Sequence, residues 1–516
     1  MRPLARRFSA TLLPFAAAAM FGASFALAAA PNLCDHGGRW TSTTARAPAA
    51  VVAYLDSLER DRFDQRAACA HWAGAFSKRH QNAAENAQSA EKLSARLIVY
   101  PAEGSSPRQL VPWLKQTGYV RQVERTRNFV IVTFSKYMPT ERLIEVINAP
   151  EIGYVEPDCD GPDYLTTSME LTPVIATEMR CWQRSARATF PNDPCLDELW
   201  GHEKIGWDSR VAARSLPRIV AVLDSGIDAS HEDLARNVVL RLKAHEAPRT
   251  QGGKLNARCA TSGRCYPHGT EMAGTIGGRM DNGIGVAGVA PNSRLLPIVI
   301  SRVEHGLLAR ISTIAAGIDA AVEDGAEIIN ISAKWPVDSR AISESIVAAV
   351  GGAAAFRRLV VTGYATSLDR DDTVREYFPS QYRCLPGVIA AVPTDMRGHE
   401  LFNPKGRQDA TDGRIQAPGV DIVVTTTENS DRGYALSESA GASSAAAYVS
   451  GAVALVWGSP PLNKCDAQQI KQLLFCRSKN GNSTRYPWVN VEFLRELANV
   501  DPGADCRTAM EALACN

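Results

Sequence analysis

The segment Ile219-Val-Ala-Val-Leu-Asp224-Ser-Gly226 is an apolar, β-branched run that ends in an acidic residue and a glycine turn. Such a run is typical of a strand buried on both faces, as in a parallel sheet. Functional groups gather at the carboxyl ends of strands in open parallel sheets, which is where Asp224 stands. On this segment alone, a turn aspartate with a structural role is the stronger interpretation.

Short apolar strands alternate with helical stretches on both sides of this segment, from about Leu196 to Ala498. This alternation predicts an α/β fold with a mostly parallel sheet covered by helices. The expected strands are 218–223, 294–300, 327–331, 359–362 and 388–392, and the expected helices are 269–277, 311–324 and 342–356.

Two further segments in this region contain residue types used in nucleophilic catalysis. His268 opens a helix of small residues, His268-Gly-Thr-Glu-Met-Ala-Gly274. Ser443 lies near the start of another, Gly441-Ala-Ser443-Ser-Ala-Ala-Ala. A serine there can cap the helix, or it can be a nucleophile whose own backbone N–H faces a developing oxyanion. Taken singly, each residue is better explained by a structural role.

Together, the order Asp224, His268, Ser443 resembles the subtilisin-like serine proteases, the peptidase S8 family. The similarity covers about Leu199 to Leu494. Further segments that match the family are Asp228–Asp233, Asn282–Pro291, Gly325–Ser332 and Ala417–Ile422. The resemblance implies a subtilisin-like three-layer fold and a secreted serine endopeptidase, made as a zymogen, that acts through an acyl-enzyme.

The resemblance also assigns roles to individual residues. His268 would take the proton of the Ser443 hydroxyl, and Asp224 would orient and stabilise the imidazole. A protein or peptide substrate would pair as an extended strand along Ser332-Ala333-Lys334. No cofactor is required by this chemistry. The family can hold a structural calcium, and Asp233 and Asn282 match such positions, together with carbonyls near Ile284 and Val286.

The sequence departs from the family pattern beside these residues. The family supplies an oxyanion-hole asparagine after a valine-rich strand, but Thr366 stands at that position. Lys334 and Trp335 follow the cleft segment where small residues are common, so the pocket before the cut bond should be narrowed or reshaped. The alternative to an active protease is therefore a weakly active or inactive protease-like module for binding or scaffolding.

The chain before this region divides into smaller parts. Residues 92–158 show the order β-α-β-β-α-β of a small ferredoxin-like α+β unit, with a helix expected at 107–116 and a final short strand at 152–155. This unit resembles the family's propeptide, of the inhibitor I9 type. That unit would be a partner of the catalytic domain. The predicted boundaries are a signal peptide at 1–28, an unassigned segment at 29–91, the propeptide-like unit at 92–158, a linker at 159–197, the catalytic domain at 198–500 and a tail at 501–516.

The N-terminus indicates export. Arg2, Arg6 and Arg7 precede an alanine-rich apolar stretch and a small-x-small cleavage site at Ala26-Leu27-Ala28. We expect a secreted or periplasmic protein without a stable membrane anchor. The 12 cysteines, an even number, favour disulfides in that compartment. Their pairing stays open, although short loops could join Cys259 to Cys265, Cys465 to Cys476 and Cys506 to Cys515.

Composition sets broad limits on partners. Hydrophobic residues make up 45% and charged residues 22% of the 516 residues, which is typical of globular proteins. The formal net charge of +1 gives no reason to expect nucleic acid as a partner. No Cys-x2-Cys pair occurs, so no zinc cluster is expected.

Overall fold

The computed structural model describes residues 96–158 and 181–515, with gaps. The gaps are 136–137, 139, 240–266, 303–307, 336–338, 352–353, 355, 369–373, 402–412, 428–432, 438–440 and 481–485. The expected signal peptide, the segment 29–91 and the Cys259–Cys265 loop lie outside the described residues. Within the described ranges, no helix combines the length and the apolar character needed to cross a membrane.

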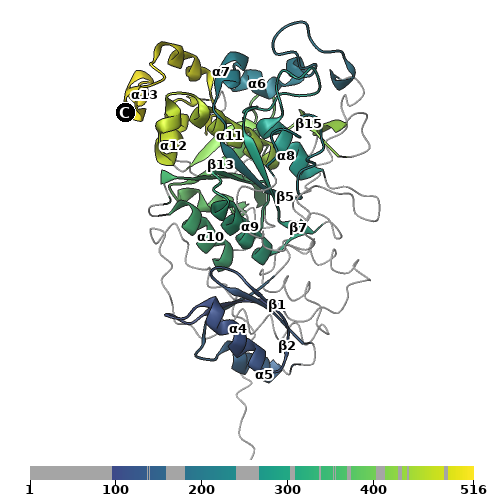
Figure 1. Ribbon diagram of the computed structural model, residues 1–516, viewed down its shortest axis with the longest axis vertical. Coiled ribbons are helices and arrows are strands. Elements are labelled where there is room, and N and C mark those ends of the chain that lie inside the picture. Colours follow the sequence, from purple (N-terminus) through teal and green to yellow (C-terminus); the bar gives the residue numbers. More distant parts are fainter. Residues whose placement is uncertain are drawn as a thin grey trace, which may run out of the picture.

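The N-terminal unit has the predicted β-α-β-β-α-β order, shown at the bottom of Figure 1. Its four strands form one antiparallel sheet in the order β2-β3-β1-β4, as expected for a ferredoxin-like unit. Strand β4 runs two residues farther than the apolar run suggested, because it continues pairing with β1 up to Pro157. Its elements are β1 (Arg96–Pro101), α4 (Pro107–Gln116), β2 (Val120–Arg125), β3 (Val130–Phe134), α5 (Thr140–Ile147) and β4 (Ile152–Pro157).

The large unit is built on an eight-stranded sheet in the order β17-β18-β14-β13-β10-β9-β5-β6. The seven strands from β18 to β6 are parallel, and β17 adds an antiparallel edge. The expected α/β class is thus confirmed. The strands are β5 (Ile219–Asp224), β6 (Arg294–Val299), β9 (Ile328–Ile331), β10 (Leu359–Gly363), β13 (Val388–Thr394), β14 (Arg414–Pro418), β17 (Lys479–Asn480) and β18 (Pro487–Trp488).

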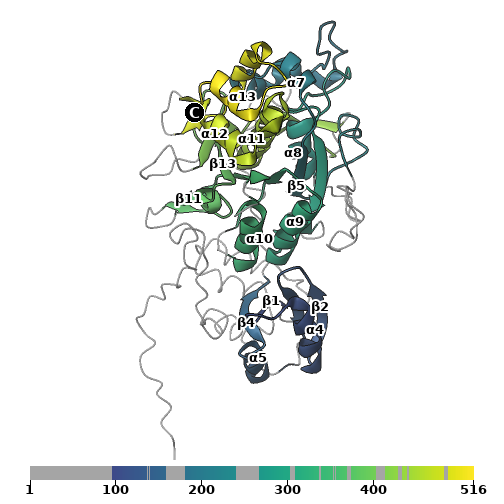
Figure 2. The ribbon, with the colours of Figure 1, turned by 60° about the vertical axis from the view of Figure 1, so that its left-hand side comes forward.

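Helices cover both faces of this sheet and make three layers (Figures 1 and 2). Alternate residues of β5 belong to different apolar clusters, as the two-residue period of a strand requires. Val220 and Val222 pack with the layer that contains α8, α11 and α12, whereas Ala221 and Leu223 pack with α9 and α10. The helices are α8 (His268–Gly277), α9 (Ile311–Glu323), α10 (Arg340–Val350), α11 (Gly441–Gly458) and α12 (Ala467–Cys476).

Helix α10 differs most from its expected bounds. It begins at Arg340, because the Ser339 side chain accepts a hydrogen bond from the backbone N–H of Ile342 and caps the helix. It ends at Val350 rather than near Phe356, because Gly351 and the glycine after it disfavour helix.

The short-loop pairing considered for the C-terminal cysteines is wrong. Cys465 pairs with Cys506, and Cys476 pairs with Cys515. Helix α12 lies between Cys465 and Cys476 and would hold them roughly 15 Å apart, too far for a disulfide. Helix α13 (Cys506–Ala512) separates Cys506 from Cys515 in the same way. The tail is therefore attached to the α12 region by two cross-links.

Candidate active site

Asp224 and His268 meet at the carboxyl edge of the sheet. Asp224 is the last residue of β5, and His268 is the first residue of α8. The Nδ1 atom of His268 lies 2.8 and 2.9 Å from the two carboxylate oxygens of Asp224. The relative exposures are 0% for Asp224 and 6% for His268, so this contact is shielded from water.

The electrostatics of this pair follow from burial and charge. Burial of the imidazole opposes its charged form, but the adjacent Asp224 carboxylate outweighs burial and raises the pKa of His268. The Nε2 atom of His268 is buried and has no hydrogen-bond partner among the described residues. With Nδ1 engaged by the carboxylate, Nε2 is the nitrogen left for proton transfer.

A glycine makes the close approach of α8 and the β5 turn possible. A Cβ on Gly269 would lie 2.2 Å from the carbonyl oxygen of Gly226 and 3.1 Å from Cβ of Asp224. The backbone N–H of Gly269 also donates to Ser225 Oγ at 3.0 Å. Only a residue without a side chain fits at this contact, which explains the glycine directly after His268.

Ser443 is the third residue of α11 and lies against the segment that follows β9. Its Oγ donates to the carbonyl oxygen of Ser332 at 3.3 Å, and Ser332 Oγ donates back to the carbonyl oxygen of Ser443 at 3.3 Å. The structure therefore brings Ser443 to the predicted substrate segment. It does not join Ser443 to His268 by a hydrogen bond, since His268 Nε2 is without one.

A buried polar network, which no local sequence pattern predicts, supports this contact. Ser450 Oγ donates to Asn330 Oδ1 at 3.0 Å, and Asn330 Nδ2 donates to Ser332 Oγ at 3.0 Å. Asn330 and Ser450 have no exposed surface. The network links the middle of α11 through β9 to the segment beside Ser443, so Asn330 fixes the position of Ser332.

A second segment contacts the segment Ser332–Trp335, and it includes the expected oxyanion residue, Thr366. Strand β11 (Thr366–Leu368) begins at Thr366 and pairs with β12 (Val374–Glu376). The next residue, Tyr377, donates its backbone N–H to the carbonyl oxygen of Ala365 at 3.0 Å. Trp335 and Phe378 exchange backbone hydrogen bonds of 2.9 Å in each direction. Residues 377–378 therefore connect the two segments.

The residues expected to bind calcium do not fit that ion. Asp233 accepts hydrogen bonds from Asn282 Nδ2 at 2.6 Å, from the Val286 N–H at 2.9 Å and from the Tyr434 hydroxyl at 2.9 Å. The amide oxygen of Asn282 accepts from the Ile284 N–H at 3.2 Å. Calcium needs oxygen lone pairs directed at it, and here donors occupy those directions. Among the described residues, no group of three or more His, Cys, Asp or Glu could hold a metal.

A second buried carboxylate holds the same loop. Asp193 accepts hydrogen bonds from the N–H groups of Asp281 at 2.8 Å and Asn282 at 3.3 Å. Asp193 lies in the loop of the chain that the disulfide between Cys181 and Cys195 closes. Burial raises the pKa of Asp193 to about 6 and that of Asp233 to about 7. Loop 281–286 is thus fixed by hydrogen bonds to two carboxylates with a reduced tendency to ionise.

The comparisons with known proteins identify the family of the chain. The model of the subtilase family, Peptidase_S8, matches residues 218–488, which is more than half of the chain. The chain therefore belongs to the subtilase family and is a serine-type endopeptidase.

Several relatives are similar over the same region. The major intracellular serine protease of Bacillus subtilis (strain 168) is 32% identical over 251 residues, which cover 48% of this chain and 70% of that protein. Subtilisin DY of Bacillus licheniformis is 29% identical over 278 residues, or 53% of this chain and 89% of that protein.

Fervidolysin of Fervidobacterium pennivorans is 31% identical over 298 residues, which are 56% of this chain and 40% of that protein. Its crystal structure, described as that of a keratinolytic enzyme related to subtilisin, matches with a TM-score of 0.56 at 23% identity. That match covers 77% of this chain and 60% of the fervidolysin chain, and it supports the fold.

Proposed function

We propose that this endopeptidase acts through Asp224, His268 and Ser443, forms an acyl-enzyme, and is exported as a zymogen. The observation that carries the proposal is the buried contact of His268 Nδ1 with both oxygens of Asp224, which leaves Nε2 without a partner among the described residues. The substrates are proteins or peptides in an extended conformation.

The chemistry follows from the two nitrogens of His268. Nδ1–H donates to the Asp224 carboxylate, so the lone pair lies on Nε2, which acts as general base. For this step the Ser443 hydroxyl must leave the Ser332 carbonyl oxygen and donate to Nε2. Catalytic hydrogen bonds often form fully only with substrate bound. The serine oxygen attacks the peptide carbonyl, and His268 passes the proton to the leaving amine while Asp224 stabilises the imidazolium.

The oxyanion of the tetrahedral intermediate needs fixed donors. The backbone N–H of Ser443, at the start of α11, is one candidate donor. Thr366 is our candidate for the second donor, because it stands in the sequence where the family has its asparagine; its side chain lies outside the described part of the structure. The substrate backbone pairs with Ser332-Ala333-Lys334 on the other side of the cleft.

Thr366→Ala should lower kcat by about 10²–10³-fold, because the oxyanion loses one donor. KM should change little, because the donor acts mainly on the transition state. The measurement is steady-state hydrolysis of a chromogenic peptide. Thr366→Ser is the matched control, since it keeps the hydroxyl and should remain close to wild type. An unchanged kcat in Thr366→Ala would remove Thr366 from the oxyanion site.

The N-terminal unit contacts the catalytic unit at the starts of two helices (Figure 2). Glu156 accepts hydrogen bonds at the start of α10, from Ser339 Oγ at 3.2 Å and from the N–H groups of Arg340 and Ala341 at 3.1 and 2.9 Å. Arg340 also lies over the rings of Tyr100 and Tyr154, 4.9 and 4.8 Å from their centroids.

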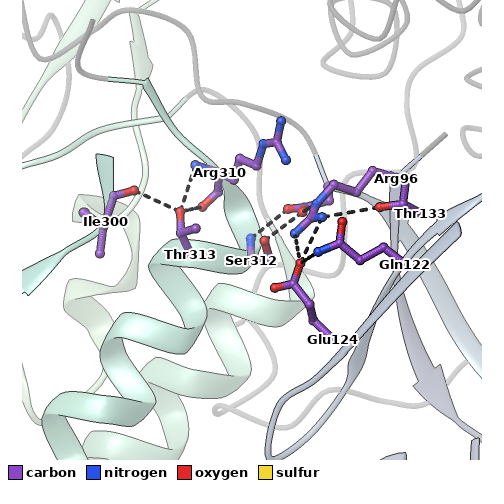
Figure 3. Close-up of polar contacts among 9 residues, drawn as sticks. Arg96, Gln122, Glu124, Thr133, Ile300, Arg310, Ser312 and Thr313 are labelled. Carbon is purple, nitrogen blue, oxygen red and sulfur yellow. Dashed lines mark hydrogen bonds and ion pairs between the residues drawn. The ribbon is translucent and has the colours of Figure 1, made fainter. Parts of the chain in front are cut away.

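A second carboxylate repeats this arrangement at α9 (Figure 3). Asp158 accepts from the Ser312 N–H at 2.9 Å, from Ser312 Oγ at 2.7 Å and from Arg96 Nε at 2.6 Å. Arg96 also pairs with Glu124 at 3.3 Å. Anions are favoured at helix N-termini, so the two carboxylates suit these helix starts. The apolar core of the N-terminal unit is continuous with that of α9 and α10. These contacts support a role for residues 92–158 as an inhibitory propeptide that stays bound after cleavage.

The double variant Glu156→Gln, Asp158→Asn should weaken the association of the N-terminal unit with the catalytic unit by about tenfold to 100-fold. The reason is that buried charge-assisted hydrogen bonds are lost. The measurement is dissociation of the N-terminal fragment from the processed full-length protein, followed by size-exclusion chromatography. Glu145→Gln is the control, since Glu145 is 64% exposed and pairs only with Arg142 of its own helix among the contacts described. Equal retention of the fragment in all three proteins would contradict the docking role.

Processing tests the proposed function as a whole. Wild-type protein should cleave its own chain between Asp158 and Leu199, whereas Ser443→Ala should remain at full length. If the wild type stays unprocessed and hydrolyses no unfolded protein, a binding or scaffold module becomes the better account.

A further inference from the structure

A chain of buried hydrogen bonds runs from the middle of α11 to the backbone of the candidate nucleophile. The Ser450 hydroxyl donates to Asn330 Oδ1 at 3.0 Å, and Asn330 Nδ2 donates to Ser332 Oγ at 3.0 Å. Ser332 Oγ in turn donates to the carbonyl oxygen of Ser443 at 3.3 Å. Asn330 and Ser450 have no exposed surface and Ser332 is 3% exposed, so these bonds are shielded from water.

The protons in this chain of bonds run in one direction. An asparagine amide accepts only at its oxygen and donates only at its nitrogen. Because the Ser450 hydroxyl donates to Oδ1, the NH₂ group of Asn330 is turned toward Ser332. Ser332 Oγ accepts that bond, so its own single proton is left for the carbonyl oxygen of Ser443. A flipped amide would present Oδ1 to Ser332 and draw this proton away from Ser443.

Packing alone does not account for the hydroxyl of Ser450. Helix α11 carries buried alanines on both sides of this residue, among them Ala446, Ala447 and Ala452, which have no exposed surface. A small side chain without a hydroxyl therefore suits the space around this helix. The hydroxyl gives Oδ1 of Asn330 a donor, and a buried oxygen that loses its donor is costly. Ser450 thus selects one orientation of the amide.

The far end of the chain of bonds is a reciprocal pair. Ser443 Oγ also donates to the carbonyl oxygen of Ser332 at 3.3 Å, so each of these serines donates its hydroxyl to the main chain of the other. For catalysis the Ser443 hydroxyl must leave that carbonyl and donate to His268. The bond from the Ser332 hydroxyl then remains, and it restrains the backbone of Ser443 in the first turn of α11.

We propose that Ser450 is a positioning residue for the nucleophile Ser443. It fixes the amide of Asn330, and that amide directs the Ser332 hydroxyl to the backbone of Ser443. The inference rests on the proposed role of Ser443 in catalysis. Without the Ser450 hydroxyl, the amide can turn, the bond from Ser332 is made only part of the time, and Ser443 visits positions from which it does not attack. Displacing a reacting group by about 1 Å can cost about 10²-fold in rate.

The test measures the second-order rate constant for the reaction of Ser443 with a small fluorophosphonate. This probe has no peptide backbone, so its rate reports on the nucleophile and not on pairing with segment 332–334. Ser450→Ala should lower the rate constant about tenfold, because Ser443 stays anchored in its helix and loses one restraint. Labelling to completion with the same probe counts the folded sites, and each rate is expressed per site. The kcat for a chromogenic peptide should fall by a similar factor.

A double-mutant cycle shows whether Ser450 acts through Ser332. Ser332→Ala should lower the rate constant at least as much, and the double variant should be no slower than Ser332→Ala, because the bond to Ser443 is already absent. Ser459→Ala is the matched control. Ser459 is buried directly after α11, and its hydroxyl donates to the carbonyl oxygen of Leu455 at 2.7 Å. This control loses a buried hydroxyl outside the chain of bonds and should keep the wild-type rate per site.

Three outcomes would overturn the proposal. A wild-type rate per site in Ser450→Ala, with only a lower melting temperature, would give Ser450 a structural role alone. Losses that multiply in the double variant would show that Ser450 acts by a route that does not include Ser332. A fall in peptide hydrolysis with an unchanged probe reaction would place the effect on substrate pairing. If the wild type takes up no probe, the proposed function itself fails, which is a different result from these three.

Discussion

Ser443→Ala should abolish hydrolysis of unfolded protein and of chromogenic peptides, with a fall in kcat on the order of 10⁶. The reason is that the attacking oxygen is removed while the substrate segment stays in place. Binding of a peptide inhibitor should change little, because the Ser332–Trp335 segment keeps its position through Asn330 and Phe378. Steady-state kinetics with the purified variant would measure the loss.

The chain supplies a matched control for this substitution. Ser444 is the next residue of α11, has no exposed surface, and its Oγ has no hydrogen-bond partner among the described residues. Ser444→Ala therefore removes the same atom one position away and should retain wild-type kcat. His268→Ala should be as inactive as Ser443→Ala, and the double variant should be no worse, because the two groups act as a unit. Substantial activity in Ser443→Ala would contradict the assignment of the nucleophile.

Asp224→Asn should lower kcat by about 10⁴-fold while leaving the protein folded. Asp224 is fully buried, and both of its oxygens face Nδ1 of His268, while Oδ1 also accepts from the Ser225 N–H at 2.7 Å. An asparagine that keeps its oxygen on the Ser225 N–H directs its NH₂ toward Nδ1. The imidazole then carries its proton on Nε2 and cannot accept the proton of Ser443.

The pH profile separates this effect from a simple loss of structure. The Asp224 carboxylate outweighs burial and raises the pKa of His268, so the neutral, basic imidazole forms as pH rises through that raised value. Without the carboxylate, burial remains and the pKa falls. The acidic limb of the kcat/KM profile should therefore move to lower pH in Asp224→Asn. Asp228→Asn, in the same loop, is the control and should keep the wild-type limb, since Asp228 contacts Ser230 instead.

Much of the fold could be predicted from local sequence. Strands β5, β9 and β10 are short β-branched runs because both of their faces are covered, and this produces an uninterrupted apolar signal. Helix α4 was predicted with its observed bounds, 107–116, because its start and its apolar spacing are set by nearby residues. The places of Asp224 at a strand end and of His268 at a helix start could be predicted for the same reason.

The features that sequence did not predict depend on contacts between distant segments. Cys465 and Cys476 are near in sequence, but the rigid helix between them directs each to a different partner. Asp233 and Asn282 are neighbours, as the calcium prediction requires. However, Tyr434, some 200 positions away in the sequence, donates its hydroxyl to the Asp233 carboxylate, which is therefore not free for calcium. The isolated bridge between Trp335 and Phe378 joins two segments that are distant in sequence, and no local pattern predicts it.

Active-site labelling shows whether Ser443 is an activated nucleophile. The processed wild-type protein, Ser443→Ala and Ser444→Ala are each treated with a fluorophosphonate, and the modified residue is located by peptide mass spectrometry. We predict one adduct on Ser443 in the wild type and in Ser444→Ala, and none in Ser443→Ala. A folded, processed wild type that takes up no probe, or a Ser443→Ala protein that is labelled as strongly as the wild type, would contradict the claim that Asp224, His268 and Ser443 form a working catalytic site.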